Sequence, residues 1–224
     1  MHLVGWLRSL IPEIGLGLAL ILGLVNPASA QSPDMANVKT WAYQLVGANP
    51  AEIAKSDYDL VVVDYALGRK GENDAASPKA IERLRYKPSG ARRVVLAYFS
   101  IGEAESFRTY WQSDWLKNPP EWLGPENPDW PDNYYVRFWS PEWQSILFGN
   151  PSAYLDRILA AGFDGVYLDG IDKYDVWQQE HPSAEADMIE LVGRVAAYGR
   201  ERHKGFLVVP QNADELLQIL AMSD

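Results

Sequence analysis

The sequence predicts an α/β protein with the fold of a (β/α)8 TIM barrel that is incomplete at its carboxyl terminus. Apolar runs of strand length alternate with helical segments, a pattern typical of a parallel sheet with right-handed crossovers. Polar residues gather at the carboxyl ends of these runs, the rim where such barrels carry their active sites. A doubly wound sheet would bring a glycine-rich phosphate loop, and the sequence contains none.

About six strands are expected, whereas a closed barrel has eight and a typical length of about 250 residues. These strands are predicted over residues 40–46, 58–65, 93–99, 134–139, 165–168 and 205–210. The strand over residues 58–65 has a β-branched centre, and residues 165–168 form a short apolar run of the kind that a strand buried on both faces shows.

Helical segments fill the spaces between these strands. Ser77 followed by Pro78, and Ser140 followed by Pro141, are typical helix starts, and Gly162 suits a left-handed helix end. The helices are predicted over residues 52–56, 78–86, 106–116, 140–159 with a break at 149–151, 184–202 and 213–222. Residues 117–133 are dense in Pro and Trp, and this composition predicts a long loop that is functional or lid-like.

The amino terminus has the pattern of a secretory signal peptide. Residues 14–25 are apolar, and an A-x-A-like cleavage site ends at Ala30. An uncleaved anchor would need roughly 18 apolar residues, and Pro12 and Glu13 shorten the run. We therefore expect residues 1–30 to be removed and residues 31–224 to form one domain. This domain would be secreted or periplasmic, without stable membrane association.

The amino-acid composition limits which kinds of molecule the protein can bind and which chemistry it can use. The formal net charge of −10 argues against nucleic acid, which needs a basic face. The chain has no cysteine, which excludes disulfides and thiol chemistry. No histidine has metal-site or triad spacing. A divalent cation held by Asp64, Asp169 and Asp172 is the weaker alternative, so we predict no metal and no cofactor.

Three aspartates are candidates for the site. Asp169 directly follows the strand over residues 165–168; Asp before Gly often marks a turn, but the strand-end position favours a catalytic carboxylate. Asp172 either caps the next turn or orients a sugar hydroxyl. Asp64 ends the strand over residues 58–65 and faces the same rim, unless it only caps the loop.

Glutamates follow the third strand. Glu103 comes after Gly102, which allows close approach of a ligand, although a glutamate in a first helical turn is also favoured by the helix dipole. Glu105 and Arg108 better fit a solvated or ion-paired helix face, and Arg108 could also hold Glu103.

Aromatic and amide side chains near strand ends complete the predicted site. Aromatic residues are most often core, but they also form platforms for sugar rings, and the chain has nine Trp and twelve Tyr. Two amides that close a buried strand need hydrogen-bond partners, which sugar hydroxyls supply. The residues predicted to bind substrate are Asp64, Tyr98, Glu103, Trp139, Asp172, Tyr174, Gln211 and Asn212.

Carboxylates surrounded by aromatic and amide groups, in an exported acidic protein, indicate glycoside hydrolysis. One carboxyl group protonates the leaving oxygen, while the other attacks the sugar or activates water. A polysaccharide is therefore the expected partner.

The motifs WAYQL (41–45), VLAYFSIGEAE (95–105), GFDGVYLDGIDKY (162–174) and VVPQN (208–212) resemble the family 114 glycoside hydrolases. This resemblance covers essentially all of residues 31–224. It implies a TIM barrel with endo-α-1,4-polygalactosaminidase activity, which cleaves with retention of configuration.

The resemblance also implies roles for particular residues. Asp169 corresponds to the family's strand-end nucleophile. The glutamate that serves as acid and base lies on a strand after the one matching residues 207–212, and Glu215 does not match it. The alternative is a non-catalytic carbohydrate-binding or scaffold domain that lacks the acid/base residue.

Overall fold

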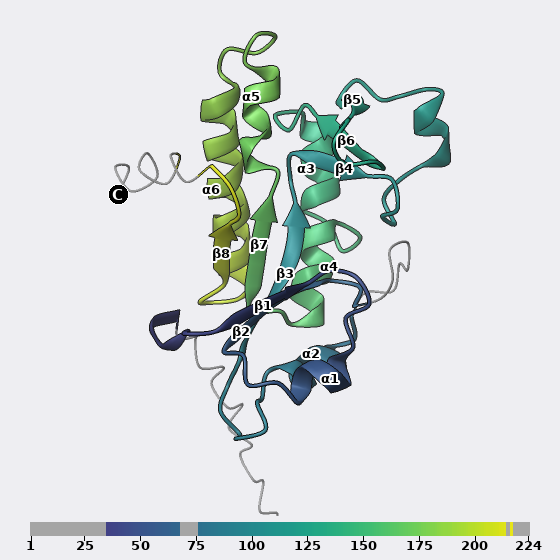
Figure 1. The fold of residues 1–224 in the computed structure, drawn as a ribbon. Coiled ribbons are helices and arrows are strands. Elements are labelled where there is room, and N and C mark those ends of the chain that lie inside the picture. The colour runs from purple at the N-terminus through teal and green to yellow at the C-terminus, as the bar shows by residue number, and fades with distance from the viewer. Residues whose placement is uncertain (1–34, 68–75, 214–215, 217–224) are drawn as a thin grey trace, which may run out of the picture. The chain divides into compact units, whose positions relative to one another are not determined.

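A five-stranded parallel sheet organises the chain in the computed structural model, which describes residues 35–67, 76–213 and 216. The expected leader, residues 1–30, lies outside these residues, as does most of the helix expected over residues 213–222. In sheet order the strands are β1 (Trp41–Gln44), β2 (Leu60–Asp64), β3 (Val94–Ser100), β7 (Gly165–Asp169) and β8 (Leu207–Pro210). This is the strand order of a barrel wall; within the described residues β1 and β8 remain its edges, so the barrel is not closed (Figure 1).

The register of the sheet brings the polar ends of its strands together. Every residue of β2 and β3 is buried, and Asp64 pairs with Tyr98 while Ser100 pairs with Asp169. Because side chains alternate between the two faces, a slip of one residue would exchange the inward and outward sets. The predicted parallel sheet with polar strand ends is thus confirmed.

Helices cover one face of the sheet and form the main core with it. Ile81 and Leu84 from one helix, and Leu155 and Ile158 from another, belong to the same core cluster as Val95. The helices are α1 (Pro50–Ala54), α2 (Pro78–Leu84), α3 (Pro141–Leu147), α4 (Tyr154–Ala161), α5 (Tyr174–Trp177) and α6 (Ala184–Arg202), with short 3-10 turns η1 (Met35–Asn37), η2 (Ser113–Leu116) and η3 (Ile171–Lys173). None of the described helices is long and apolar enough to span a bilayer.

Several predicted helix ends are confirmed. Ser77 precedes α2, and its hydroxyl accepts a hydrogen bond from the Ala80 amide at 3.2 Å. Gly162 ends α4 in the left-handed conformation, with φ of 87°. The helix predicted over residues 184–202 has the bounds of α6.

The helix predicted over residues 106–116 is wrong. Only η2 at its end is helical, because its aromatic residues pack into a tryptophan cluster instead of along one helix face. Trp115 lies edge-on to Trp111 and to Trp122, with ring centroids 5.2 Å and 5.0 Å apart. Tertiary packing has overridden the helical periodicity.

The strand predicted over residues 134–139 does not belong to the parallel sheet. Residues Asn133–Val136 form β6, which pairs antiparallel with β4 (Glu103–Glu105) and β5 (Leu123–Glu126). Strand β5 also gives part of the expected loop over residues 117–133 a regular structure. This small sheet follows the carboxyl end of β3 (Figure 1). It therefore lies at the end of the parallel sheet where the polar strand ends gather.

Candidate active site

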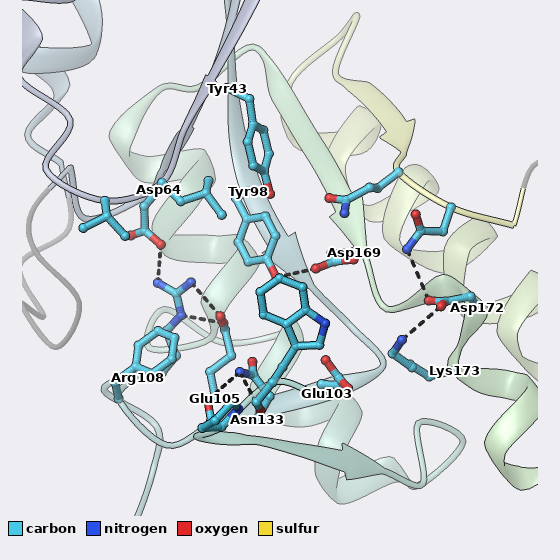
Figure 2. Close-up of a pocket in the computed structure, with 17 residues that line it drawn as sticks. Tyr43, Asp64, Tyr98, Glu103, Glu105, Arg108, Asn133, Asp169, Asp172 and Lys173 are labelled. Atoms are coloured by element: carbon cyan, nitrogen blue, oxygen red, sulfur yellow. Dashed lines mark hydrogen bonds and ion pairs between the residues drawn. The ribbon is translucent and has the colours of Figure 1, made fainter. Parts of the chain in front are cut away.

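A cavity of about 600 Å³ lies at the carboxyl ends of the parallel strands. Its volume falls within the range of ligand-binding pockets. Figure 2 shows acidic side chains from separate strands pointing into it. The charged residues that line it are Asp64, Glu103, Glu105, Arg108, Asp169, Asp172 and Lys173.

Asp169 ends β7 and is held by two hydrogen bonds. The Tyr98 hydroxyl, from neighbouring β3, donates to Oδ2 at 2.5 Å, and the Gly170 amide donates to Oδ1 at 2.8 Å. Burial raises the pKa of Tyr98 well above its ordinary value, and the nearby charges of Glu105 and Asp169 raise it further. The phenol therefore remains a donor, and the half-buried carboxylate is fixed in orientation.

Two glycines bring Glu103 close to this carboxylate. A Cβ on Gly102 would lie 2.0 Å from the Gly170 carbonyl oxygen, and Gly170 itself has φ of 75°. The Ile101 amide also donates to the Asp169 carbonyl at 3.0 Å. The turn after β3 can pack this closely on the turn after β7 only because both residues at the contact lack a side chain.

Glu103 is buried, with 6% of its surface exposed. Its Oε1 accepts a 2.6 Å hydrogen bond from the Asn127 amide. Burial raises the pKa of Glu103; the Asn127 bond and the charge of Lys173 oppose this, while Asp169 adds to it. The surroundings therefore favour the protonated acid more than water does.

Arg108 binds two of the acids rather than Glu103. Its Nη1 lies 2.7 Å from Asp64 Oδ2, and its Nε donates to Glu105 Oε2 at 2.6 Å. All three side chains are buried. Glu105 and Arg108 are thus ion-paired, as one reading of the sequence held, but they form an internal cluster and not a solvated helix face. Burial alone would lower the pKa of Arg108, but Tyr154, Glu105 and Asp64 raise it above its ordinary value.

Asp172, Gln211 and Asn212 line the side of the cavity that lies opposite Asp64 and Arg108 (Figure 2). Lys173 Nζ lies 2.9 Å from Asp172 Oδ2, and the Asn212 amide donates to Asp172 Oδ1 at 3.4 Å. The backbone amide of Gln211 donates to the Leu168 carbonyl at 2.8 Å, which places both amides beside the end of β7. Gln211 and Asn212, both predicted to bind substrate, are among the residues that line the cavity.

Two predicted binding residues lie elsewhere. Trp139 stacks on His181, with ring centroids 4.1 Å apart, because the strand before it belongs to the small sheet and not to the barrel wall. Tyr174 begins α5 and is buried in the core. Neither is among the described residues that line the cavity.

Other cavity residues were not in the predicted site. Phe107, Trp130 and Lys173 line it, together with Tyr43, whose pKa is raised by burial and by Asp169. For Trp130 the available signal was the Pro- and Trp-rich segment that contains it. Among the described residues, no group of three or more His, Asp or Glu side chains is arranged to hold a metal ion.

The fold and the site together define a class: proteins of the TIM-barrel type with an acidic, aromatic-lined cavity at the carboxyl ends of parallel strands. The chain belongs to glycoside hydrolase family GH114, whose family model matches residues 24–223. The predicted resemblance is thereby confirmed.

The chain is also similar to two uncharacterised proteins. An uncharacterised protein of Methanocaldococcus jannaschii is 42% identical over 182 residues, which are 80% of this chain and 50% of the relative. One from Thermotoga maritima is 42% identical over 181 residues, 79% of this chain and 53% of the relative. The chain thus spans about half the length of these curated relatives.

Two solved structures share the fold. Ega3 of Aspergillus fumigatus, in complex with galactosamine, superposes with a TM-score of 0.58 at 22% identity, covering 88% of this chain and 68% of Ega3. The glycoside hydrolase domain of PelA from Pseudomonas aeruginosa gives a TM-score of 0.58 at 15% identity, covering 82% of this chain and 63% of that domain.

Proposed function

We propose that this chain cleaves glycosidic bonds in a galactosamine-containing polysaccharide, with Asp169 as the nucleophile and with retention of anomeric configuration. The observation that carries the proposal is the position of Asp169 at the carboxyl end of β7, where Tyr98 and Gly170 hold it within the cavity. Membership of the family supports glycosidase chemistry.

The proposed reaction has two steps. Asp169 attacks the anomeric carbon, the bond to the leaving oxygen breaks, and that oxygen takes a proton. Water then attacks the anomeric carbon of the glycosyl ester, gives one proton to the group that acted as donor in the first step, and releases the sugar and the Asp169 carboxylate. The hydrogen bonds to both oxygens of Asp169 orient it without rearrangement during the reaction.

A proton donor is the second group that the reaction requires. The family resemblance assigns it to a glutamate on a strand after the one matching residues 207–212. Among the described residues, Glu103 lines the cavity and has the raised pKa that suits a donor. Loss of hydrolysis in Glu103→Gln, with substrate still bound, is the result expected if Glu103 fills this role.

The charge of the cavity supports an amino sugar as substrate. Five acidic side chains line it against two basic ones, Arg108 and Lys173, so negative groups outnumber positive ones even when Glu103 is protonated. Such a surplus attracts a cationic sugar and disfavours an anionic one. The related Ega3 was solved with galactosamine, a sugar that carries an ammonium group. Asp64, Glu103, Asp172 and the amides of Gln211 and Asn212 would hold the remaining polar groups.

Export is part of the proposal, resting on the leader pattern over residues 1–30. Expression of the full-length gene in a bacterial host, followed by amino-terminal sequencing of the extracellular or periplasmic product, tests it. A product that begins at Gln31 is expected, and retention of Met1 would contradict it.

The decisive experiment measures hydrolysis of a galactosamine polymer by the wild type, Asp169→Asn and Asp175→Asn. Asp175 is an exposed aspartate outside the cavity lining, so its substitution is a matched control. We expect activity to be lost only in Asp169→Asn, and nuclear magnetic resonance of the first product to show retained configuration. Undiminished activity of Asp169→Asn would overturn the assignment. Binding of the polymer without turnover by the wild type would instead favour the carbohydrate-binding alternative.

A further inference from the structure

Trp130 presents its indole to solvent at the edge of the acidic cavity. It lies between β5 and β6, it is 66% exposed, and it is one of the residues that line the cavity. By contrast, Trp143 and Trp122 are buried. A single exposed aromatic residue is common on protein surfaces, so exposure alone carries no conclusion. What distinguishes Trp130 is how firmly its segment is held.

The backbone around Trp130 is tied by a local hydrogen-bond network. The Trp130 amide donates to the Asn127 carbonyl at 3.3 Å, and the Asn133 amide donates to the Trp130 carbonyl at 3.2 Å. The Asn133 side chain donates to the carbonyls of Trp130 and Pro131 at 3.3 Å and 3.0 Å. Pro131 also restricts the backbone directly after Trp130. The indole is therefore displayed on a segment with little freedom to move.

Asp132 shows that this conformation is imposed by its surroundings. Its φ of 69° is in the left-handed region, which is uncommon for a residue with a side chain, although aspartate adopts it more often than most. Glu126 Oε1 accepts a 2.8 Å hydrogen bond from the Asp132 amide, and the Ser106 amide donates to the Asp132 carbonyl at 2.9 Å. Strain of this kind persists where neighbouring contacts determine the backbone, and it concentrates at ligand-binding sites.

The same segment is bonded to the acidic part of the cavity. Asn127 is buried, and its amide donates the 2.6 Å hydrogen bond to Glu103 Oε1. The position of Trp130 is thereby fixed relative to Glu103. An aromatic side chain on a backbone held in this way is partly pre-organised to bind, because the backbone loses little freedom when a ligand arrives.

We infer that Trp130 is the platform of a second sugar subsite, which stacks against an amino-sugar ring adjacent to the ring held at Asp169. This inference rests on the proposed function and extends it from one ring to a stretch of polymer. The apolar C–H face of a pyranose packs on the indole, whose face also attracts an ammonium group. Tyr43, 43% exposed, lines the same cavity and adds aromatic surface.

The experiment compares binding of galactosamine monomer with binding of α-1,4-linked galactosamine oligomers by isothermal titration. The parent protein carries Asp169→Asn so that the oligomers stay intact. Adding Trp130→Ala should lower the affinity for the oligomers about tenfold and leave the affinity for the monomer unchanged. Trp130→Phe should restore part of the loss, since it keeps an aromatic face.

Trp41→Ala is the matched control. Trp41 is 56% exposed on β1 and is not among the described residues that line the cavity. It should leave both affinities unchanged, and equal thermal unfolding midpoints should verify that the variants are folded. If Trp130→Ala binds oligomers as tightly as the parent, or if Trp41→Ala weakens them equally, the inference is overturned while hydrolysis by the wild type still upholds the proposed function. A parent that binds neither ligand, with a wild type that hydrolyses no polymer, overturns both.

Discussion

Tyr98 and Asp169 belong to adjacent parallel strands, and the Tyr98 hydroxyl donates a 2.5 Å hydrogen bond to Asp169 Oδ2. The tyrosine is 7% exposed. It lies two residues before the end of β3, so its ring extends along the sheet to reach the residue at the end of β7. This contact converts a strand-end aspartate into a carboxylate with a defined orientation in the cavity. Its energetic importance can be measured.

Tyr98→Phe removes this hydrogen bond and leaves the ring in place. A hydrogen bond to a charged group contributes about 1.5–3 kcal/mol, so turnover of the galactosamine polymer should fall about ten- to a hundredfold. The Gly170 amide still binds Asp169 in the variant, and we expect residual activity rather than complete loss. Unchanged steady-state turnover would show that Tyr98 does not position Asp169.

Gly102→Ala tests the close packing of the two strand-end turns. The new methyl group would overlap the Gly170 carbonyl, which is backbone and cannot rotate away. Overpacking of this kind costs about 1–3 kcal/mol, and displacement of Glu103 and Asp169 should reduce hydrolysis by roughly a hundredfold. Urea unfolding and polymer hydrolysis measure the two effects.

Gly193→Ala is the control for this glycine substitution. Gly193 lies in α6, and a Cβ there would meet no atom within 4 Å. Alanine in a helix interior is favoured over glycine by about 0.5–1 kcal/mol, so this variant should be slightly more stable with unaltered activity. A stability loss equal to that of Gly102→Ala would argue against the packing explanation.

Glu103 should make the stability of the protein depend on pH. In the unfolded chain its pKa is about 4.3, while burial raises its pKa in the folded state. At pH values between these two pKa values the folded state binds more protons than the unfolded state. The contribution of Glu103 to the free energy of unfolding is therefore fully present below the unfolded pKa. It is lost as pH rises through the folded pKa.

Glu103→Gln removes this titration. From mildly acidic to neutral pH, the free energy of unfolding of the wild type should therefore decline relative to that of the variant. Urea unfolding at a series of pH values gives both curves. A wild type that gains stability relative to Glu103→Gln over the same interval would contradict the raised pKa.

Arg108→Met should leave Asp64 and Glu105 buried without their shared cation. Breaking a buried ion pair from one side costs about 3–5 kcal/mol. The loss should be smaller at acid pH, because burial already raises the pKa of Glu105 and Arg108 opposes that rise. Arg108→Lys keeps the charge without the planar fork, so its loss of stability should lie between the wild type and Arg108→Met. Equal stability of all three proteins would exclude a structural role for the cluster.

Much of the barrel wall could be predicted because its signals are local. The β-branched run in β2 and the apolar run in β3 are long enough to show strands buried on both faces. Likewise Ser77 and Gly162 mark helix ends by the chemistry of their own backbones. Polar residues directly after such strands could be assigned to one rim, since parallel strands end on the same side.

The errors arise where distant contacts decide. Residues 106–116 have a helical spacing of apolar residues, yet Trp111 and Trp115 find better partners in an aromatic cluster. The apolar run that forms β6 indicated a strand, but periodicity does not reveal the partner strand. Because β6 pairs in the small antiparallel sheet, Trp139 stacks on His181 outside the cavity, whereas Trp130 lines the cavity.

By itself the sequence determined the α/β class, the parallel strands, the acidic rim and the place of Asp169 on it. These follow from side-chain periodicity and from residues at strand ends, which depend on neighbours along the chain. Only the tertiary structure decided that Tyr98 binds Asp169, that Arg108 also binds Asp64, and that Asn127 joins Glu103 to the segment bearing Trp130. Such contacts join residues through space, and their geometry depends on the register of the sheet and on the packing of Gly102 against Gly170.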